Sequence, residues 1–285
     1  MRASLRRALV ALLLSVTLAA PAAAAPAMWR IADEDSQVWL FGSVHSFNSR
    51  VSWRTAAFNK ALRNADLVYF EMRTAVPQGE YMQTMAELGL NPGGKSLGDY
   101  LSRAQRQKLA QVIATYGLDA DALDAMRPWF AAMTISGATG AQLAAEIRPG
   151  VEDTLKREIP RRKERGLDTL ETQLRALADL SDRAQVGMLM EAIAGGAEEP
   201  DLTQAWLDGD VEGLYGPTAA AFGRPGSEIF EALLTRRNKR WAAQIEKLLA
   251  GDQDVMVIVG AAHFGGASGL PLLLRKRGLP IERVQ

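Results

Sequence analysis

Short apolar runs lie near both ends of the chain, and a long stretch with helical periodicity separates them. The apolar segments 29–32 and 38–41 are joined by the turn-forming sequence 33–36, which predicts two strands. Residues 53–64 have the spacing of a helix, and 66–70 form a short β-prone run typical of a buried strand. This strand–helix–strand order indicates a parallel pair.

The middle of the chain, about residues 78–250, is dominated by helical periodicity. One interruption at 166–170 predicts a short strand inside this region. Strand character returns in the continuous apolar run 255–259, typical of a buried parallel strand. A helix at 270–277 and a strand at 280–284 follow. We therefore expect an α/β fold, with a small, mostly parallel sheet built from both chain ends and a large helical insertion.

The first residues have the pattern of an export signal. Three arginines precede the apolar run Ala8–Ala20, which is too short to span a bilayer, and small residues follow it up to Ala25. A buried N-terminal helix is the alternative. We expect cleavage near Ala25, a periplasmic or secreted protein, and no integral membrane segment in the mature chain, because no later apolar stretch is long enough. The predicted division is a signal peptide at 1–25 and one domain at 26–285, with a sheet core at about 26–75, 166–172 and 253–285 and a helical insertion at about 78–250.

The amino-acid composition excludes several kinds of functional site. Lys and Arg together number 33, as do Asp and Glu, so no excess charge indicates a nucleic-acid partner. The chain has no cysteine, which excludes disulfides, thiolate metal sites and thiol nucleophiles. The two histidines are therefore the natural starting point for a functional site.

A residue able to bind metal or to move protons follows each of four apolar runs. These residues are His45, Glu71, Glu171 and His263. Ligands of open α/β sheets bind outside the carboxyl ends of the strands. If the four strands are parallel, we expect the four side chains to converge on one pocket at that edge. Glu171 has a second interpretation, as an acidic residue in the first turn of the next helix.

The two histidines stand in matching contexts, Gly42-Ser43-Val44-His45 and Gly260-Ala261-Ala262-His263. A glycine there lets the chain bend and lets the backbone approach a ligand closely. Two neutral imidazoles with one or two carboxylates suit zinc, manganese, cobalt or iron. The same groups would also serve as general base and orienting acid without a metal. A single histidine beside a strand is often only structural, but the repeated context favours a shared site.

Arg237 and Asn238 interrupt an apolar helical stripe. The 3–4 spacing of this stripe predicts an apolar residue at one of these two positions; its members are Phe230, Leu234, Trp241, Ile245 and Leu248. A guanidinium on an inward face needs a carboxylate partner or an anionic ligand. We expect Arg237 to contact Glu71 or Glu171, either as a structural ion pair or at the wall of the pocket.

Several segments together resemble the TraB/GumN family and, more distantly, the Tiki metalloproteases. They run in family order over nearly the whole mature chain: Trp39-Leu40-Phe41-Gly42-Ser43-Val44-His45, Tyr69-Phe70-Glu71, Arg127-Pro128-Trp129, Pro149-Gly150-Val151-Glu152-Asp153, Leu170-Glu171-Thr172, Trp206-Leu207-Asp208-Gly209-Asp210, Arg237-Asn238 and Val259-Gly260-Ala261-Ala262-His263. The resemblance implies an α/β core shared with erythromycin-esterase and ChaN-like proteins. It also implies a site formed by His45, His263 and Glu71. Ser43 stands where a threonine is common, which keeps the hydroxyl.

Three functions are compatible with these residues. The leading hypothesis is an exported, protease-like, metal-dependent hydrolase of a peptide or small acyl substrate, with His45 and His263 binding the metal. Glu71 would be a ligand or general base, and Arg237 would stabilise the oxyanion. The alternatives are a non-catalytic envelope protein that holds a metal, haem or small ligand in the same pocket, and a metal-independent, esterase-like hydrolase.

Overall fold

The computed structural model describes residues 24–47, 49–143, 148–195 and 201–285. In this part of the chain, six strands form one sheet in the order β6-β4-β7-β2-β1-β8. Their bounds are β1 (Met28–Ala32), β2 (Gln37–Ser43), β4 (Leu67–Met72), β6 (Glu164–Asp168), β7 (Val255–Gly260) and β8 (Glu282–Arg283). A separate two-stranded sheet pairs β3 (Ser46–Phe47) with β5 (Arg148–Pro149).

The centre of the large sheet is parallel. β7 pairs in parallel with β2 on one side and β4 on the other, and β4 pairs in parallel with β6. β1 and β8 extend the sheet in antiparallel fashion. Because β7 comes from the end of the chain and its two neighbours from the beginning, the sheet is built from both chain ends. This confirms the α/β class predicted from the sequence.

Helices account for most of the rest of the described chain. They are α1 (Ala56–Asn64), α2 (Gln78–Gly89), α3 (Arg103–Tyr116), α4 (Ala120–Asp124), α5 (Pro128–Leu143), α6 (Val151–Leu155), α7 (Leu170–Ala178), α8 (Asp182–Ile193), α9 (Thr203–Leu207), α10 (Val211–Ala221), α11 (Glu228–Phe230), α12 (Arg236–Leu249) and α13 (Leu270–Lys276). Shorter turns are the 3₁₀ segments η1 (Leu97–Tyr100) and η3 (Ala261–Phe264) and the π-helical η2 (Glu231–Thr235), which joins α11 to α12.

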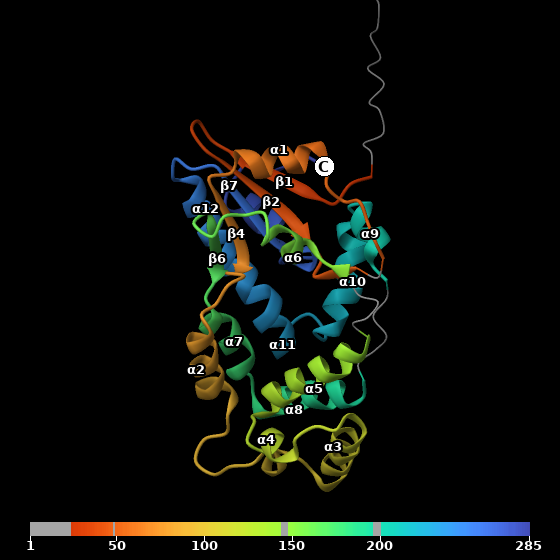
Figure 1. The fold of residues 1–285 in the computed structure, drawn as a ribbon. Helices are drawn as coiled ribbons and strands as arrows, with labels where there is room; N and C mark the ends of the chain where they lie inside the picture. The colour runs from red at the N-terminus through yellow and green to blue at the C-terminus, as the bar shows by residue number, and fades with distance from the viewer. Residues whose placement is uncertain (1–23, 48, 144–147, 196–200) are drawn as a thin grey trace, which may run out of the picture.

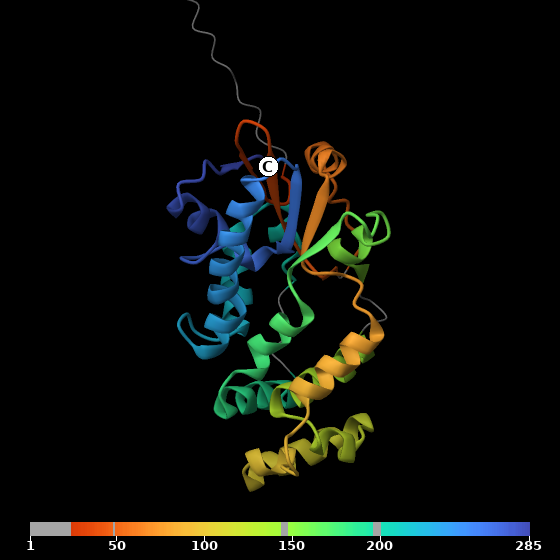
Figure 2. The same cartoon turned by 90° about the vertical axis from the view of Figure 1, so that its left-hand side faces the viewer.

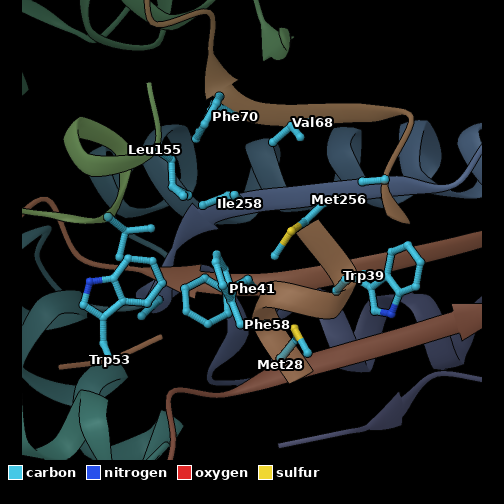
Figure 3. Packing of buried hydrophobic residues seen from close by; sticks show 14 of the residues in the cluster. Met28, Trp39, Phe41, Trp53, Phe58, Val68, Phe70, Leu155, Met256 and Ile258 are labelled. Carbon is cyan, nitrogen blue, oxygen red and sulfur yellow. The ribbon is translucent and has the colours of Figure 1, made fainter. Parts of the chain in front are cut away.

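Both faces of the sheet are covered, which explains the continuous apolar run of β7. Along this strand Val255 and Val257 face one side, and Met256 and Ile258 face the other. The first face packs against α12 and α13, and the second against α1, α6 and α9 (Figure 2). Figure 3 shows the second layer, where Phe41 of β2 lies among residues of β4, β7 and α1. A strand buried on both faces needs apolar side chains at every position.

The helical region that follows β4 has apolar clusters of its own. One joins α3, α4, α5 and α8, and another joins α2, α5 and α7. In Figure 1 these helices lie below the sheet, beyond the carboxyl ends of its parallel strands. The insertion therefore extends from the same edge at which the four candidate residues were expected.

The expected export signal, residues 1–25, lies almost entirely outside the described residues. The described residues that follow it are packed: Ala27 is buried, and the side chain of Gln285 donates to the carbonyl oxygen of Pro26. Within the described part of the chain, no helix is long and apolar enough to cross a membrane.

Candidate functional site

Strand register brings the two Gly-x-x-His loops together. In the parallel pair β2·β7, Gly42 lies opposite Val259 and Ser43 opposite Gly260. His45 and His263 follow these paired positions by two and three residues, so both loops leave the sheet at one edge. On the other side of β7, Glu71 comes one residue after the Phe70–Ile258 pair. The sheet thus places Glu71 beside the two loops.

His263 is buried, with its side chain only 6% exposed, and its ring packs against Trp241 at a centroid distance of 4.5 Å. Nδ1 lies 2.6 Å from Oδ1 of Asn238. The Asn238 amide nitrogen donates to the carbonyl oxygens of His263 and Ser268, at 3.0 and 2.8 Å. Both donors of the amide are therefore used, so Oδ1 must accept, and the proton of neutral His263 lies on Nδ1.

Two consequences follow for this imidazole. Burial lowers the pKa of His263 to about 4, so the ring is neutral at pH 7. The lone pair is then on Nε2, which lies 3.7 Å from Oε1 of Glu71. The protein thus presents an unprotonated ring nitrogen to a carboxylate.

Glu71 is an ionised carboxylate held by specific donors. Its Oε1 accepts the backbone N–H of Gly260 at 2.8 Å, and its Oε2 accepts from Nη2 of Arg237 at 2.6 Å. Burial by itself would raise the pKa of Glu71, but the charge of His263 when protonated, the charge of Arg237 and the Gly260 N–H bring it down to about 2. A Cβ at Gly260 would lie 3.1 Å from Oε1, so glycine makes this close approach possible.

Arg237 bridges two strand ends. Its Nε donates to Asp168 at 3.0 Å, and Asp168 also accepts from Arg240 at 2.6 Å. The guanidinium lies over the ring of Trp241 at 4.4 Å. Nη1 of Arg237 has no hydrogen-bond partner among the described residues, while Nε and Nη2 are both used. The prediction that Arg237 contacts Glu71 or Glu171 is confirmed for Glu71.

A π-helical segment precedes Arg237 and Asn238. Glu231–Thr235 adds a residue to the turn between α11 and α12, and such bulges often occur at functional sites. Beyond it, Arg237 and Asn238 are both buried on the face that carries Trp241. This places a salt-bridge donor and an amide side by side in the site.

His45 has a different environment. Its side chain is 76% exposed, and Nδ1 lies 3.4 Å from Oε1 of Glu152. The same carboxylate oxygen accepts a hydrogen bond from the hydroxyl of the buried Ser43. The hydrogen bond with Glu152 raises the pKa of His45 above its usual value, and the charges of Glu71 and Asp153 add to this.

The sequence model of the TraB/PrgY/gumN family matches residues 27–283. The chain belongs to the TraB/PrgY/gumN family. A protein of Treponema pallidum (strain Nichols) named "Uncharacterized protein" is 25% identical over 196 residues, which is 63% of this chain and 58% of that relative. The chain thus spans less than two thirds of the relative's length. No solved structure matches.

One placement expected for this TraB/PrgY/gumN member is wrong. Glu171 does not follow a strand end, because β6 ends at Asp168 and Thr169 caps a helix that begins at Leu170. Thr169 accepts the backbone N–H of Thr172, which fixes that start. Glu171 is exposed in the first turn of α7 and accepts from Arg175. The alternative interpretation, an acid in the first turn of a helix, describes it correctly.

Two site residues of this family member were missed. Asp168 occupies the β6 strand end, where it holds Arg237, and Glu152 contacts His45 from α6. Thr169 is a residue type that often caps helices, which would have ended the strand at Asp168. Glu152 lies in a segment that resembles the family, but its contact with His45 depends on a pairing between segments about a hundred residues apart.

The side chains around His263 can be compared with those that a metal site needs. Among the described residues, no group of three or more His, Cys, Asp or Glu side chains is arranged to hold a metal ion. His263 and Glu71 do face each other through a ring nitrogen and a carboxylate oxygen, which are ligand types that zinc, manganese, cobalt and iron accept. His45, the expected third ligand, pairs through Nδ1 with Glu152 and has Nε2 left over.

Proposed function

We propose that this protein is a hydrolase that cleaves a peptide or related acyl substrate with the help of a divalent metal ion. The observation that carries the proposal is the Asn238–His263 pair, which fixes a neutral imidazole with its Nε2 lone pair toward Glu71. Metal-bound histidines commonly have their other ring N–H held by such a partner. His263 and Glu71 would hold the ion, and His45 would be the third ligand.

In this proposal each residue around the ion has a separate role in hydrolysis. A divalent ion at this position would lower the pKa of a bound water molecule. It would also polarise the substrate carbonyl that this water attacks. Asn238 keeps His263 in the required tautomer, and Arg237 keeps Glu71 ionised. Nη1 of Arg237 is left to stabilise the oxyanion that forms during attack. If it does so, Arg237→Met lowers turnover by roughly 100-fold or more.

A second candidate, hydrolysis without a metal, is favoured by the pair His45–Glu152. The imidazole is exposed and has a carboxylate at Nδ1, which is the arrangement of a general base held by an acid. In this case His45 would take a proton from water in its neutral form, so turnover would rise as the pH approaches the raised pKa of His45, about 9, and Arg237 would keep its role toward the oxyanion. The two candidates use the same substrate position and differ in their need for a metal.

Metal content and turnover separate the candidates. The protein would be purified without a histidine tag, because a tag would outnumber its two native histidines. About one zinc, manganese, cobalt or iron per chain, with peptide or ester hydrolysis that a chelator abolishes and the metal restores, supports the first candidate. Hydrolysis that persists in metal-free protein supports the second. Absence of turnover on peptide and ester libraries, with and without added metal, contradicts both.

A matched pair of variants ties the result to the site. His263→Gln removes the proposed ligand, whereas Arg277→Gln removes an exposed ion pair with Glu246 on α12. We expect the first variant to lose metal and turnover and the second to keep both. Equal metal content in the two variants would contradict the assignment of His263.

We also propose that the protein is exported and acts in the periplasm or outside the cell. The arginine-flanked run Ala8–Ala20 supports this, because it has the flanks and length of a signal peptide. Mass spectrometry of the native protein should find a mature N-terminus near Pro26. An intact Met1 on cytosolic protein would contradict it.

A further inference from the structure

We propose that Glu152 is the positioning residue of His45: its carboxylate accepts the Nδ1–H of the imidazole and leaves Nε2 as the nitrogen that serves the site. This inference rests on the proposed function, because it assigns His45 a working nitrogen there. It is independent of whether that nitrogen binds a metal or takes a proton from water.

The backbone fixes Glu152 relative to His45. The N–H of Gly150 donates to the carbonyl oxygen of His45, and the N–H of Val151 donates to that of Val44, both at 3.0 Å. A Cβ at Gly150 would lie 2.2 Å from the carbonyl carbon of His45, so only glycine fits this contact. The segment before α6 is thus locked to the histidine loop, and Glu152 follows directly.

The carboxylate of Glu152 has a second anchor that does not involve His45. The hydroxyl of Ser43 donates to Oε1, and Ser43 is a buried residue at the end of β2. The acceptor on α6 is therefore anchored to the end of β2, and Nδ1 of the exposed imidazole lies 3.4 Å from it. A rigid acceptor at Nδ1 selects one tautomer and one ring orientation.

The buried oxygen of the same carboxylate argues against a purely structural role. Oε2 of Glu152 is buried and has no hydrogen-bond partner among the described residues. Burying a carboxylate oxygen without a donor is destabilising. A neutral side chain would pack in this position at a lower cost, so the charge is best explained by its effect on His45.

The two histidines support the same conclusion. Nδ1 of His263 is held by Asn238, and Nδ1 of His45 faces Glu152. In both loops the side-chain partner is at Nδ1, and Nε2 is left for the site. The partners differ in charge, an amide in one case and a carboxylate in the other.

Imidazole tautomers test the inference directly, because the chain has only two histidines. The full chain would be labelled with ¹⁵N-histidine and freed of metal, and its ring nitrogens would be observed by NMR where both rings are neutral. We expect the proton on Nδ1 in both rings of the wild type. Glu152→Gln should shift the His45 signals toward mixed tautomers, because an amide can turn either its oxygen or its NH₂ to Nδ1. The His263 signals should not change.

Asp153→Asn is the matched control, since it removes a neighbouring exposed carboxylate that pairs with Lys156. We expect it to leave the His45 tautomer unchanged. An identical His45 pattern in the wild type and Glu152→Gln would overturn the inference, as would an equal change in Asp153→Asn. If Glu152→Gln does not fold, Ser43→Ala removes the anchor instead and should shift the same His45 signals, and no shift there would count against the inference.

Zinc titration provides a second readout that is tied to the proposed function. Loss of a carboxylate behind a metal-bound histidine lowers metal affinity or activity by about 10–100-fold. We expect such a loss of zinc affinity in Glu152→Gln but not in Asp153→Asn. If neither the wild type nor the variants bind zinc, the metal proposal fails, and the tautomer measurement still decides the role of Glu152.

Discussion

The loop after β2 and the loop after β7 carry the same Gly-x-x-His pattern but give the imidazole different surroundings. His263 lies beneath the surface, against Trp241 and with an amide at Nδ1. His45 is exposed and has a carboxylate at Nδ1. Burial lowers the pKa of the first ring, and the hydrogen bond with Glu152 raises that of the second. The motif therefore places both rings at one edge of the sheet, while burial in one case and the carboxylate partner in the other shift the pKa of each ring.

The buried side of the site, around His263 and Glu71, and the exposed side, around His45, therefore have different properties. The buried side is rigid and charge-compensated, because Arg237 joins Glu71 to Asp168. The exposed side can exchange protons with solvent through His45. Variants of the two sides should consequently differ in the balance between lost stability and lost function.

Loss of Arg237 should have the largest effect on stability. Arg237→Met removes the cation from the buried carboxylate Glu71, and breaking such a pair from one side costs about 3–5 kcal/mol. Urea denaturation measures the loss. Arg240→Met is the control, because its side chain is 39% exposed and Asp168 keeps Arg237; we expect a loss of about 1 kcal/mol or less. Equal losses in the two variants would remove the distinction between the buried and exposed arginines.

The amide of Asn238 should matter for both stability and function. Asn238→Ala leaves the carbonyl oxygens of His263 and Ser268 without this donor, which should destabilise the fold by about 1–3 kcal/mol. Zinc affinity should fall by about 10–100-fold.

On the exposed side, Glu152→Gln should reduce the affinity for zinc but change the free energy of unfolding by less than about 1 kcal/mol, because the hydroxyl of Ser43 keeps an acceptor. A larger loss of stability in Glu152→Gln than in Asn238→Ala would reverse the comparison.

Two glycines test the same contrast at the backbone. Gly150→Ala places a Cβ against the main chain of His45, whereas Gly260→Ala places one 3.1 Å from the side-chain oxygen of Glu71. Main chain cannot move aside as a carboxylate can, so Gly150→Ala should cost about 1–3 kcal/mol and Gly260→Ala less. Thermal unfolding measures both. A similar cost at the two positions would mean that Glu71 is held as rigidly as the backbone.

Glu171 should have the smallest effect. Glu171→Gln removes an exposed carboxylate in the first turn of α7, where it pairs with Arg175. Such surface changes usually alter the free energy of unfolding by no more than about 0.5 kcal/mol. Turnover and the NMR signals of both histidines should match the wild type. A clear loss of turnover would return Glu171 to the site.

The sequence allowed the buried half of the site to be predicted better than the exposed half. Glu71 lies near the end of β4 and His263 follows β7, and strand ends of a parallel sheet meet at one edge whatever the rest of the chain does. Arg237 was found because a charged residue broke an apolar helical stripe. These signals are local, so they are visible without knowledge of the tertiary fold.

The contact of Glu152 depends on a tertiary pairing that local patterns do not contain, whereas the error at Asp168 lies in the end assigned to one strand. Glu152 reaches His45 because β3 and β5 pair, and each of these strands has only two residues. A two-residue strand leaves no periodicity to detect. Asp168 was passed over because the strand was extended through the capping residue Thr169 to Glu171. Errors of a few residues at an element's end are enough to exchange one carboxylate for another.

The position of β7 has a consequence for the order in which the molecule is assembled. This strand lies between β2 and β4 but is made from Val255–Gly260 of a 285-residue chain. During synthesis, β2 and β4 therefore have no shared neighbour until the chain has been made beyond residue 260, whereas the helices of the insertion already have local partners. Contacts of such large sequence separation form slowly, because a long loop must close first. The edge of the sheet that carries the candidate site is thus among the last parts of this domain to form, and a chain that ends before β7 retains the helices of the insertion but lacks the central strand of the sheet.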